Sequence, residues 1–146
     1  MSPDVVGALM NVIYGGNFYF LEFLMEFQKT FIEKRTDFTW EQLGESLLAY
    51  SLDPKAFLEV FTVIEKEILS NKQNKMPDDI YHLLQAFSIT GYGSEELYEY
   101  FEKIIGKNIS EVEAEDIVPV LNAFSNTKYV REKFYVLFHR KIKELR

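Results

Sequence analysis

Apolar residues recur along the chain at a fixed spacing of 37 residues. Inside each interval they follow helical periodicity, as at Ile80, Leu84 and Phe87 and then at Leu97 and Phe101. Shifting the sequence by 37 positions superimposes columns of apolar residues: Met10, Leu47, Leu84 and Leu121; Val12, Ala49, Ala86 and Ala123; Phe27, Ile64, Phe101 and Phe138. Four copies at one spacing predict an array of stacked repeats.

Each repeat is predicted to be a helical hairpin. Turn-forming residues interrupt the apolar pattern in the same columns each time, at 15–17, 52–54, 90–93 and 125–127. One hairpin cannot bury its apolar face alone, so neighbours must cover it. We therefore predict an all-α fold, an α-solenoid-like array of about four helical hairpins with a right-handed superhelix, in a single domain over residues 1–146. The expected units are about 2–38, 39–75, 76–112 and 113–146.

Capping patterns mark the expected starts of the first helices. Thr39, with Gln42 three residues later, forms a capping-box pattern. In the fourth unit, Ser110 followed by Glu113 indicates an earlier start than the 37-residue frame does. Pro119 would lie inside this helix. Both boundaries stay open at this point.

Composition narrows the class of protein. Hydrophobic residues make up 47% of the chain, which is ample for a core, and there is no cysteine for disulfides or thiolate metal sites. Glu22 and Glu26 interrupt the longest apolar run, so we expect no membrane insertion. No basic residue precedes Lys29, so no cleaved presequence is expected. The net charge of −7 disfavours a nucleic-acid surface and favours partner proteins.

One helical-repeat family resembles this chain. The resemblance lies in two successive stretches, which are Ile80, Leu84, Ala86-Phe87, Leu97, Phe101 and Ile105, and then Ile117, Leu121, Ala123-Phe124, Phe134, Phe138 and Ile142. They are similar to the hairpins of the octotricopeptide and heptatricopeptide group, which includes FAST-kinase-type proteins. The resemblance implies a mitochondrial location, with the cytoplasm as the alternative, and a role in RNA binding or as an accessory part of an organellar assembly. It implies no activity, since this sequence has no counterpart of the RAP domain that often accompanies such repeats.

Catalytic and metal-binding motifs are not evident in the sequence. His82 and His139 lie on separate helices without ligand spacing around either, and we interpret both as packed or partly exposed side chains. The stretch from Gly91 to Ser94 lacks the lysine of a phosphate loop and is interpreted as a turn with Ser94 as a helix cap. We therefore expect no enzyme activity, cofactor, metal or small-molecule substrate.

A second apolar stripe is predicted on the second helix of the first unit. Phe18, Leu21, Met25 and Ile32 share one helical face, apart from the residues expected in the core. A contact inside the unit, with Val5 or Met1, is one explanation. The other is a protein-binding surface, which is the main site hypothesis.

Positive charge is concentrated on the last helix. Residues 114–146 sum to +3, whereas residues 77–113 sum to −6. The basic side chains proposed to make contacts are Arg131, Lys133, Arg140, Lys141 and Lys143. They form either a polar cap at the end of the stack or a contact for RNA or an acidic partner. A polar column on the first helices, Asn11, Gln85 and Asn122, is broken by Leu48, which favours solvation over base reading.

These patterns lead to two hypotheses about function. The first is a non-catalytic helical-repeat scaffold or adaptor, an accessory subunit of a larger protein or ribonucleoprotein assembly with other protein subunits as partners. The second is a short organellar RNA-binding repeat protein that uses the basic C-terminal helix.

Overall fold

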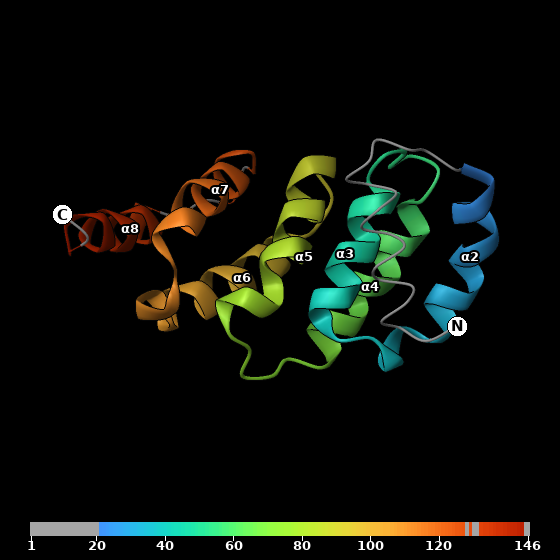
Figure 1. Cartoon of the computed structure of the whole chain (residues 1–146), viewed down its shortest axis with the longest axis horizontal. Coiled ribbons are helices and arrows are strands. Elements are labelled where there is room, and N and C mark those ends of the chain that lie inside the picture. Colours follow the sequence, from blue (N-terminus) through green and yellow to red (C-terminus); the bar gives the residue numbers. More distant parts are fainter. Residues whose placement is uncertain (1–20, 128, 130–131, 145–146) are drawn as a thin grey trace.

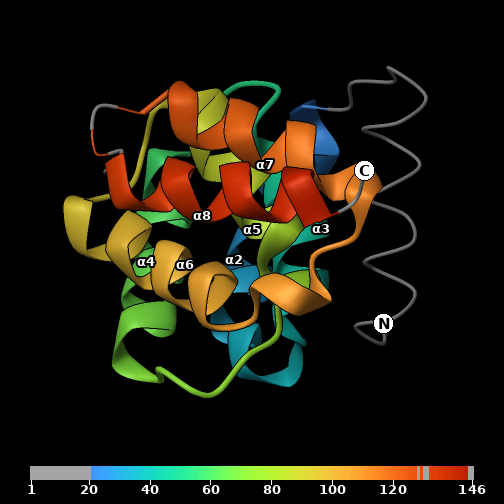
Figure 2. The ribbon, with the colours of Figure 1, turned by 90° about the vertical axis from the view of Figure 1, so that its left-hand side faces the viewer.

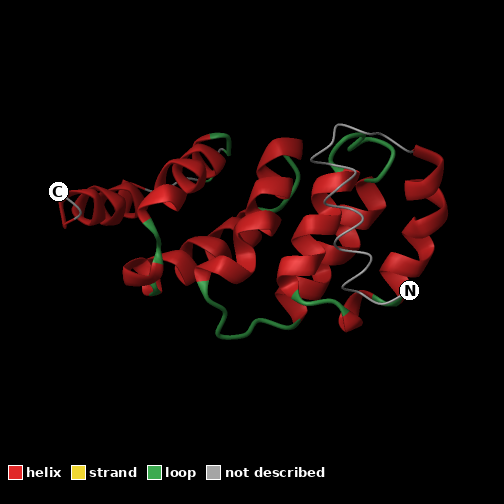
Figure 3. Ribbon diagram, in the orientation of Figure 1, coloured by secondary structure: helices red, strands yellow, loops and turns green. Residues whose placement is uncertain are grey.

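The computed structural model describes residues 21–127, 129 and 132–144. Its α-helices are α2 (Leu21–Glu33), α3 (Trp40–Tyr50), α4 (Leu58–Ser70), α5 (Pro77–Thr90), α6 (Glu95–Lys107), α7 (Ala114–Ser125) and α8 (Glu132–Glu144). Two 3-10 helices, η1 (Arg35–Asp37) and η2 (Ile109–Glu111), precede α3 and α7. The described residues contain no strand (Figure 3), so the all-α prediction is confirmed for them.

The helices follow one another along the long axis of the molecule (Figure 1). Three hairpins, α3 with α4, α5 with α6, and α7 with α8, lie in sequence order, and α2 packs against α4 at one end. The first helices of the hairpins pack against each other, α3 on α5 and α5 on α7. Seen along the long axis, α8 lies nearest the viewer at the other end (Figure 2).

Capping residues explain several helix boundaries. The Thr39 hydroxyl accepts a hydrogen bond from the Gln42 N–H, and the Gln42 side chain accepts one from the Thr39 N–H, which confirms the capping box. Ser94 caps α6 by accepting from the Leu97 N–H. Gly91 ends α5 in the left-handed region at φ 76°, a backbone conformation that residues other than glycine rarely adopt. The interpretation of residues 91–94 as a turn and cap is therefore confirmed.

The start of α7 follows Glu113 and not Ser110. Ser110 lies in η2, and Val112 then leaves helical geometry with an extended ψ of 118°. The earlier start suggested by Ser110 is wrong, because the extended backbone at the buried Val112 separates η2 from α7. Pro119 lies inside α7 at an exposed position.

Equivalent helices of successive hairpins begin at regular intervals, and one core runs through all of them. The first helices α3, α5 and α7 begin at residues 40, 77 and 114, and the second helices α4, α6 and α8 begin at 58, 95 and 132. Buried side chains from α2 to α8 form one apolar core cluster. Among the described residues, no helix is both long and apolar enough to cross a bilayer.

Candidate functional site

The predicted apolar stripe on α2 is only partly exposed. Phe18 lies outside the described residues. Met25 is 60% exposed, whereas Leu21 and Ile32 are half-buried and pack against the core. An α-helix turns by about 100° per residue, so Leu21 and Ile32 lie between the buried Leu24 and the exposed Met25. The stripe therefore differs from the expected separate face, and its protein binding stays a prediction.

The basic residues predicted for the last helix differ in their surroundings. Arg131 lies outside the described residues, and the surroundings of the Lys133 side chain are not among those described. Arg140 and Lys143 are exposed, and the Lys141 ammonium donates to the Ser110 carbonyl over 3.4 Å. Lys141 therefore connects α8 to η2, and the two exposed cations carry the RNA hypothesis.

The junctions between hairpins reuse the same positions. At two successive junctions, an aromatic residue near the start of a second helix contacts two aromatic residues of the following hairpin. The ring contacts are Phe61 with Phe87 and Tyr92, at centroid distances of 5.5 and 5.3 Å, and Tyr98 with Phe124 and Tyr129, at 6.5 and 5.7 Å. Each residue of the second set lies 37 positions after its counterpart in the first. At both junctions, therefore, aromatic side chains of the following hairpin cover an aromatic residue of the hairpin before it.

The same positions are exposed at the α8 end. Tyr135 stands 37 residues after Tyr98 and is 38% exposed, whereas Tyr98 is 2% exposed. Ile142 is 36% exposed, although its counterparts Ile105 and Ile68 are fully buried. Val118, on α7, adds a further exposed apolar side chain. We call Tyr135 and Ile142 the open face, because residues seven positions apart lie on one side of a helix and α8 is nearest the viewer in Figure 2.

A groove of about 750 Å³ runs along the first helices α3, α5 and α7. Its polar lining includes Glu41, Asp78, Tyr81, His82, Gln85, Asp116 and Asn122. Gln85 and Asn122 belong to the polar column considered for base reading, but Leu48 of that column is buried. Three carboxylates and no lysine or arginine line this groove. It is therefore unsuited to phosphate groups and suited to cations.

Burial and like charge weaken acids in this groove. Burial raises the pKa of the Asp116 carboxyl, and the nearby carboxylates of Glu115, Asp78 and Glu113 raise it further. Burial and the charges of Asp116, Asp78 and Glu113 also raise the pKa of the Tyr81 hydroxyl. These groups would gain from a positive charge in the groove.

Three potential metal ligands converge at one end of the groove. Glu41 and Glu45 lie one turn apart on α3, and His82 faces them from α5. One ligand atom from each residue lies within 4.8 Å of the other two. Sequence reasoning missed this set because the ligands come from two hairpins. The one signal is that Glu45 and His82 share a column, being 37 residues apart.

Comparisons with protein-family models, curated proteins and solved structures find no match.

Proposed function

We propose that this protein is a non-catalytic helical-repeat scaffold, an accessory subunit that holds a partner protein at its open face. The observation that carries the proposal is the exposure of Tyr135 and Ile142. Their counterparts in the preceding hairpin, Tyr98 and Ile105, are buried, and aromatic side chains of the next hairpin cover Tyr98. The two side chains lie seven residues apart, on the same side of α8. A partner that covers them would continue the pattern of the stack.

An α-solenoid-like array of about four hairpins underlies the proposal. Two features support it. The helix starts at 40, 77 and 114 and at 58, 95 and 132 share one spacing. Aromatic contacts at equivalent positions join two successive pairs of hairpins. Repeat arrays typically bind through the shape of such surfaces, so function need not depend on a catalytic residue.

The inner junctions indicate the chemistry of the partner. Inside the array, the equivalent positions are covered by an aromatic residue from a first helix and a tyrosine from the turn that follows it, as Phe124 and Tyr129 cover Tyr98. We expect the partner to be a helical hairpin that presents aromatic side chains in this way. Fully burying each apolar side chain would contribute about 1.5–3 kcal/mol before the costs of association.

The resemblance to octotricopeptide-type repeats supports a mitochondrial location and membership of an organellar assembly. The cytoplasm is the alternative. Imaging of the tagged protein in its native cells distinguishes the two.

The first experiment compares what the tagged protein captures from its native cells with what a double variant, Tyr135→Glu with Ile142→Glu, captures. Capture is carried out at moderate and at high salt, with and without nuclease. We expect stoichiometric partner proteins to survive high salt and nuclease with the wild type and to be lost with the double variant. Both residues are partly exposed, so we expect the double variant to keep its core. Circular dichroism checks that it keeps its helix content.

Met25→Glu is the matched control at the other end of the molecule, where the side chain is 60% exposed. It tests the stripe on α2 without replacing Leu21, whose packing against the core would confound the result. Partners that resist the double variant and are lost with Met25→Glu would overturn the open-face proposal and place binding at α2. Partners that resist all three substitutions would overturn both.

The alternative function is RNA binding through α8. Exposed Arg140 and Lys143 favour it, whereas the acidic groove along the first helices disfavours it. Association that disappears with nuclease, or falls steeply as salt rises, would replace the scaffold proposal with this one.

A further inference from the structure

Glu41, Glu45 and His82 form a compact set of nitrogen and oxygen ligands. One donor atom of each lies within 4.8 Å of the others. Metal–ligand bonds of about 2.0–2.2 Å in a tetrahedral site place donors roughly 3.3–3.6 Å apart. Binding would therefore require a change of side-chain rotamer, for which the exposed Glu41 has room. Glu41 is exposed, so the site is open to solvent on one side, while Glu45 and His82 are half-buried.

Backbone packing holds the three residues together. Gly44, on α3 between the two glutamates, lies so close to α5 that a side-chain Cβ there would be 2.6 Å from the His82 Cβ. This approach fixes the turn of α3 that carries Glu41 and Glu45 against the turn of α5 that carries His82. The ligands are therefore positioned by two packed helices rather than by a loop, which favours a preorganised site.

His82 has an unmet bonding requirement. Its Nδ1 atom is buried and has no hydrogen-bond partner among the described residues. A metal ion coordinated by the imidazole would use a nitrogen lone pair, and its positive charge would favour the ionised carboxylates of Glu41 and Glu45.

We propose that Glu41, Glu45 and His82 bind a divalent first-row transition metal ion, with Zn²⁺ as the occupant. The imidazole nitrogen distinguishes the site from the all-oxygen sites that Ca²⁺ and Mg²⁺ prefer. Two carboxylates neutralise the two charges of the ion, and water completes a four-coordinate shell. The ion joins α3 to α5 and thereby connects two consecutive hairpins.

The chelator-treated full-length protein provides the test. Titration with Zn²⁺ is followed by calorimetry, and titration with Co²⁺ by the visible absorption that reports its coordination. We expect one ion per chain. His82→Ala should weaken Zn²⁺ binding by more than about 100-fold, because even groups that only orient a metal ligand are worth about 10–100-fold. Zn²⁺ should raise the melting temperature of the wild type and not that of His82→Ala.

Two matched controls make the test specific. His139→Ala removes the other histidine of the chain, which is exposed on α8, and Glu59→Gln removes an exposed carboxylate on α4. Both should bind Zn²⁺ like the wild type, whereas Glu41→Gln and Glu45→Gln should bind it more weakly. Should His82→Ala lose helix content, exposed Glu41→Gln decides the outcome. A wild type that binds no Zn²⁺, or Zn²⁺ binding unchanged in His82→Ala or in a folded Glu41→Gln, would overturn the proposal.

Discussion

Gly44 is the residue on which the packing of α3 against α5 depends most directly. A Cβ atom at this position would lie 2.6 Å from both the His82 Cβ and the Leu83 backbone nitrogen. Backbone atoms of a packed helix cannot rotate away as the end of a side chain can. Any larger residue must therefore push the two helices apart.

Gly44→Ala should destabilise the protein by about 1–3 kcal/mol, because the overlap with α5 outweighs the gain that alanine normally brings to a helix. Gly106→Ala is the matched control, since the added Cβ would meet only the end of the Leu137 side chain at 3.4 Å. It should be neutral or stabilise by up to about 1 kcal/mol. Urea unfolding of both variants measures the difference. Equal stability of the two variants would show that α3 and α5 can separate at little cost.

The contacts and burial of individual residues were harder to predict from the sequence than the helices themselves. The spacing of Glu41 and Glu45 is visible as one helical turn, but His82 joins them only because Gly44 allows the helices to meet. Leu21 shows the converse. Its apolar column indicated a binding face, whereas packing against the core covers half of it. Periodicity identifies a helical face but not the width of the surface that a neighbouring helix covers.

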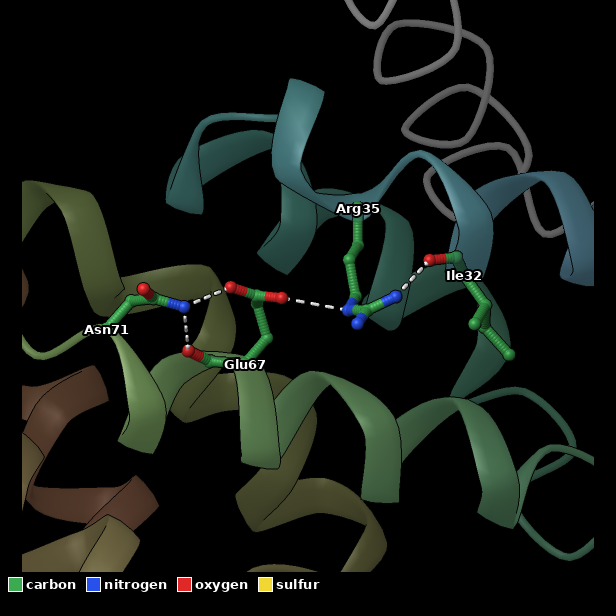
Figure 4. A network of polar contacts seen from close by, with 4 residues as sticks. All are labelled: Ile32, Arg35, Glu67 and Asn71. Atoms are coloured by element: carbon green, nitrogen blue, oxygen red, sulfur yellow. Dashed lines mark hydrogen bonds and ion pairs between the residues drawn. The ribbon is translucent and has the colours of Figure 1, made fainter.

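At the scale of elements, a polar network connects the link after α2 to α4 (Figure 4). The Arg35 guanidinium donates to the Glu67 carboxylate over 2.8 Å and to the Ile32 carbonyl, in the last turn of α2, over 2.7 Å. Asn71 donates to the same carboxylate from the end of α4. The Glu67 side chain is only 13% exposed, so water screens this ion pair less than a surface pair. Arg35 thus satisfies a helix-end carbonyl and joins two helices at once.

Glu67→Ala should cost about 1–2 kcal/mol of unfolding free energy, because Arg35 and Asn71 both lose a charge-assisted partner. The matched control is Glu96→Ala, which breaks the pair of Lys72 and Glu96 at exposures of 46% and 63%. That loss should be below about 0.5 kcal/mol. Thermal unfolding of the two variants side by side gives the comparison. A cost for Glu67→Ala no greater than that of the control would mean that solvent already satisfies these groups.

Helices were more predictable than the links between them. Thr39 and Ser94 identified two helix starts through capping patterns that depend only on nearby residues. The start of α7 could not be identified in the same way, because Ser110 carries a capping pattern but lies in a 3-10 turn. The two starts are distinguished by the extended backbone at the buried Val112. Burial depends on contacts distant in the sequence, which a local capping pattern does not report.

At the scale of the whole molecule, charge is separated. Acidic groups gather along the first helices, where Asp78 and Asp116 line the groove, and exposed Arg140 and Lys143 lie on α8 at one end. Burial is the main reason why the pKa of the Asp116 carboxyl is raised, and the carboxylates of Glu115, Asp78 and Glu113 raise it further, so like charges repel one another along the first helices. The neutral-pH form of the protein therefore carries an electrostatic cost.

Lowering the pH from 7 towards 4.5, the ordinary pKa of a glutamate, should raise the melting temperature. Burial raises the pKa of Glu45, Glu102 and Asp116 above the ordinary values of 4.5, 4.5 and 3.8. The folded state consequently binds protons more readily than the unfolded state between those values and the raised ones. Stability increases as the pH falls through that window and decreases as it rises. Added salt at pH 7 should act in the same direction, because it screens the repulsion.

Asp116→Asn isolates the contribution of one carboxylate to this behaviour. The variant should be more stable than the wild type at pH 7 by no more than about 0.5 kcal/mol, since water screens a partly exposed charge. Its melting temperature should also depend less on pH between 7 and the ordinary aspartate pKa of 3.8 than that of the wild type. Scanning calorimetry of both proteins across this range measures the two slopes. A wild-type melting temperature that falls steadily from pH 7 to 4.5 would contradict the argument, because favourable ion pairs would then outweigh the repulsion along the first helices.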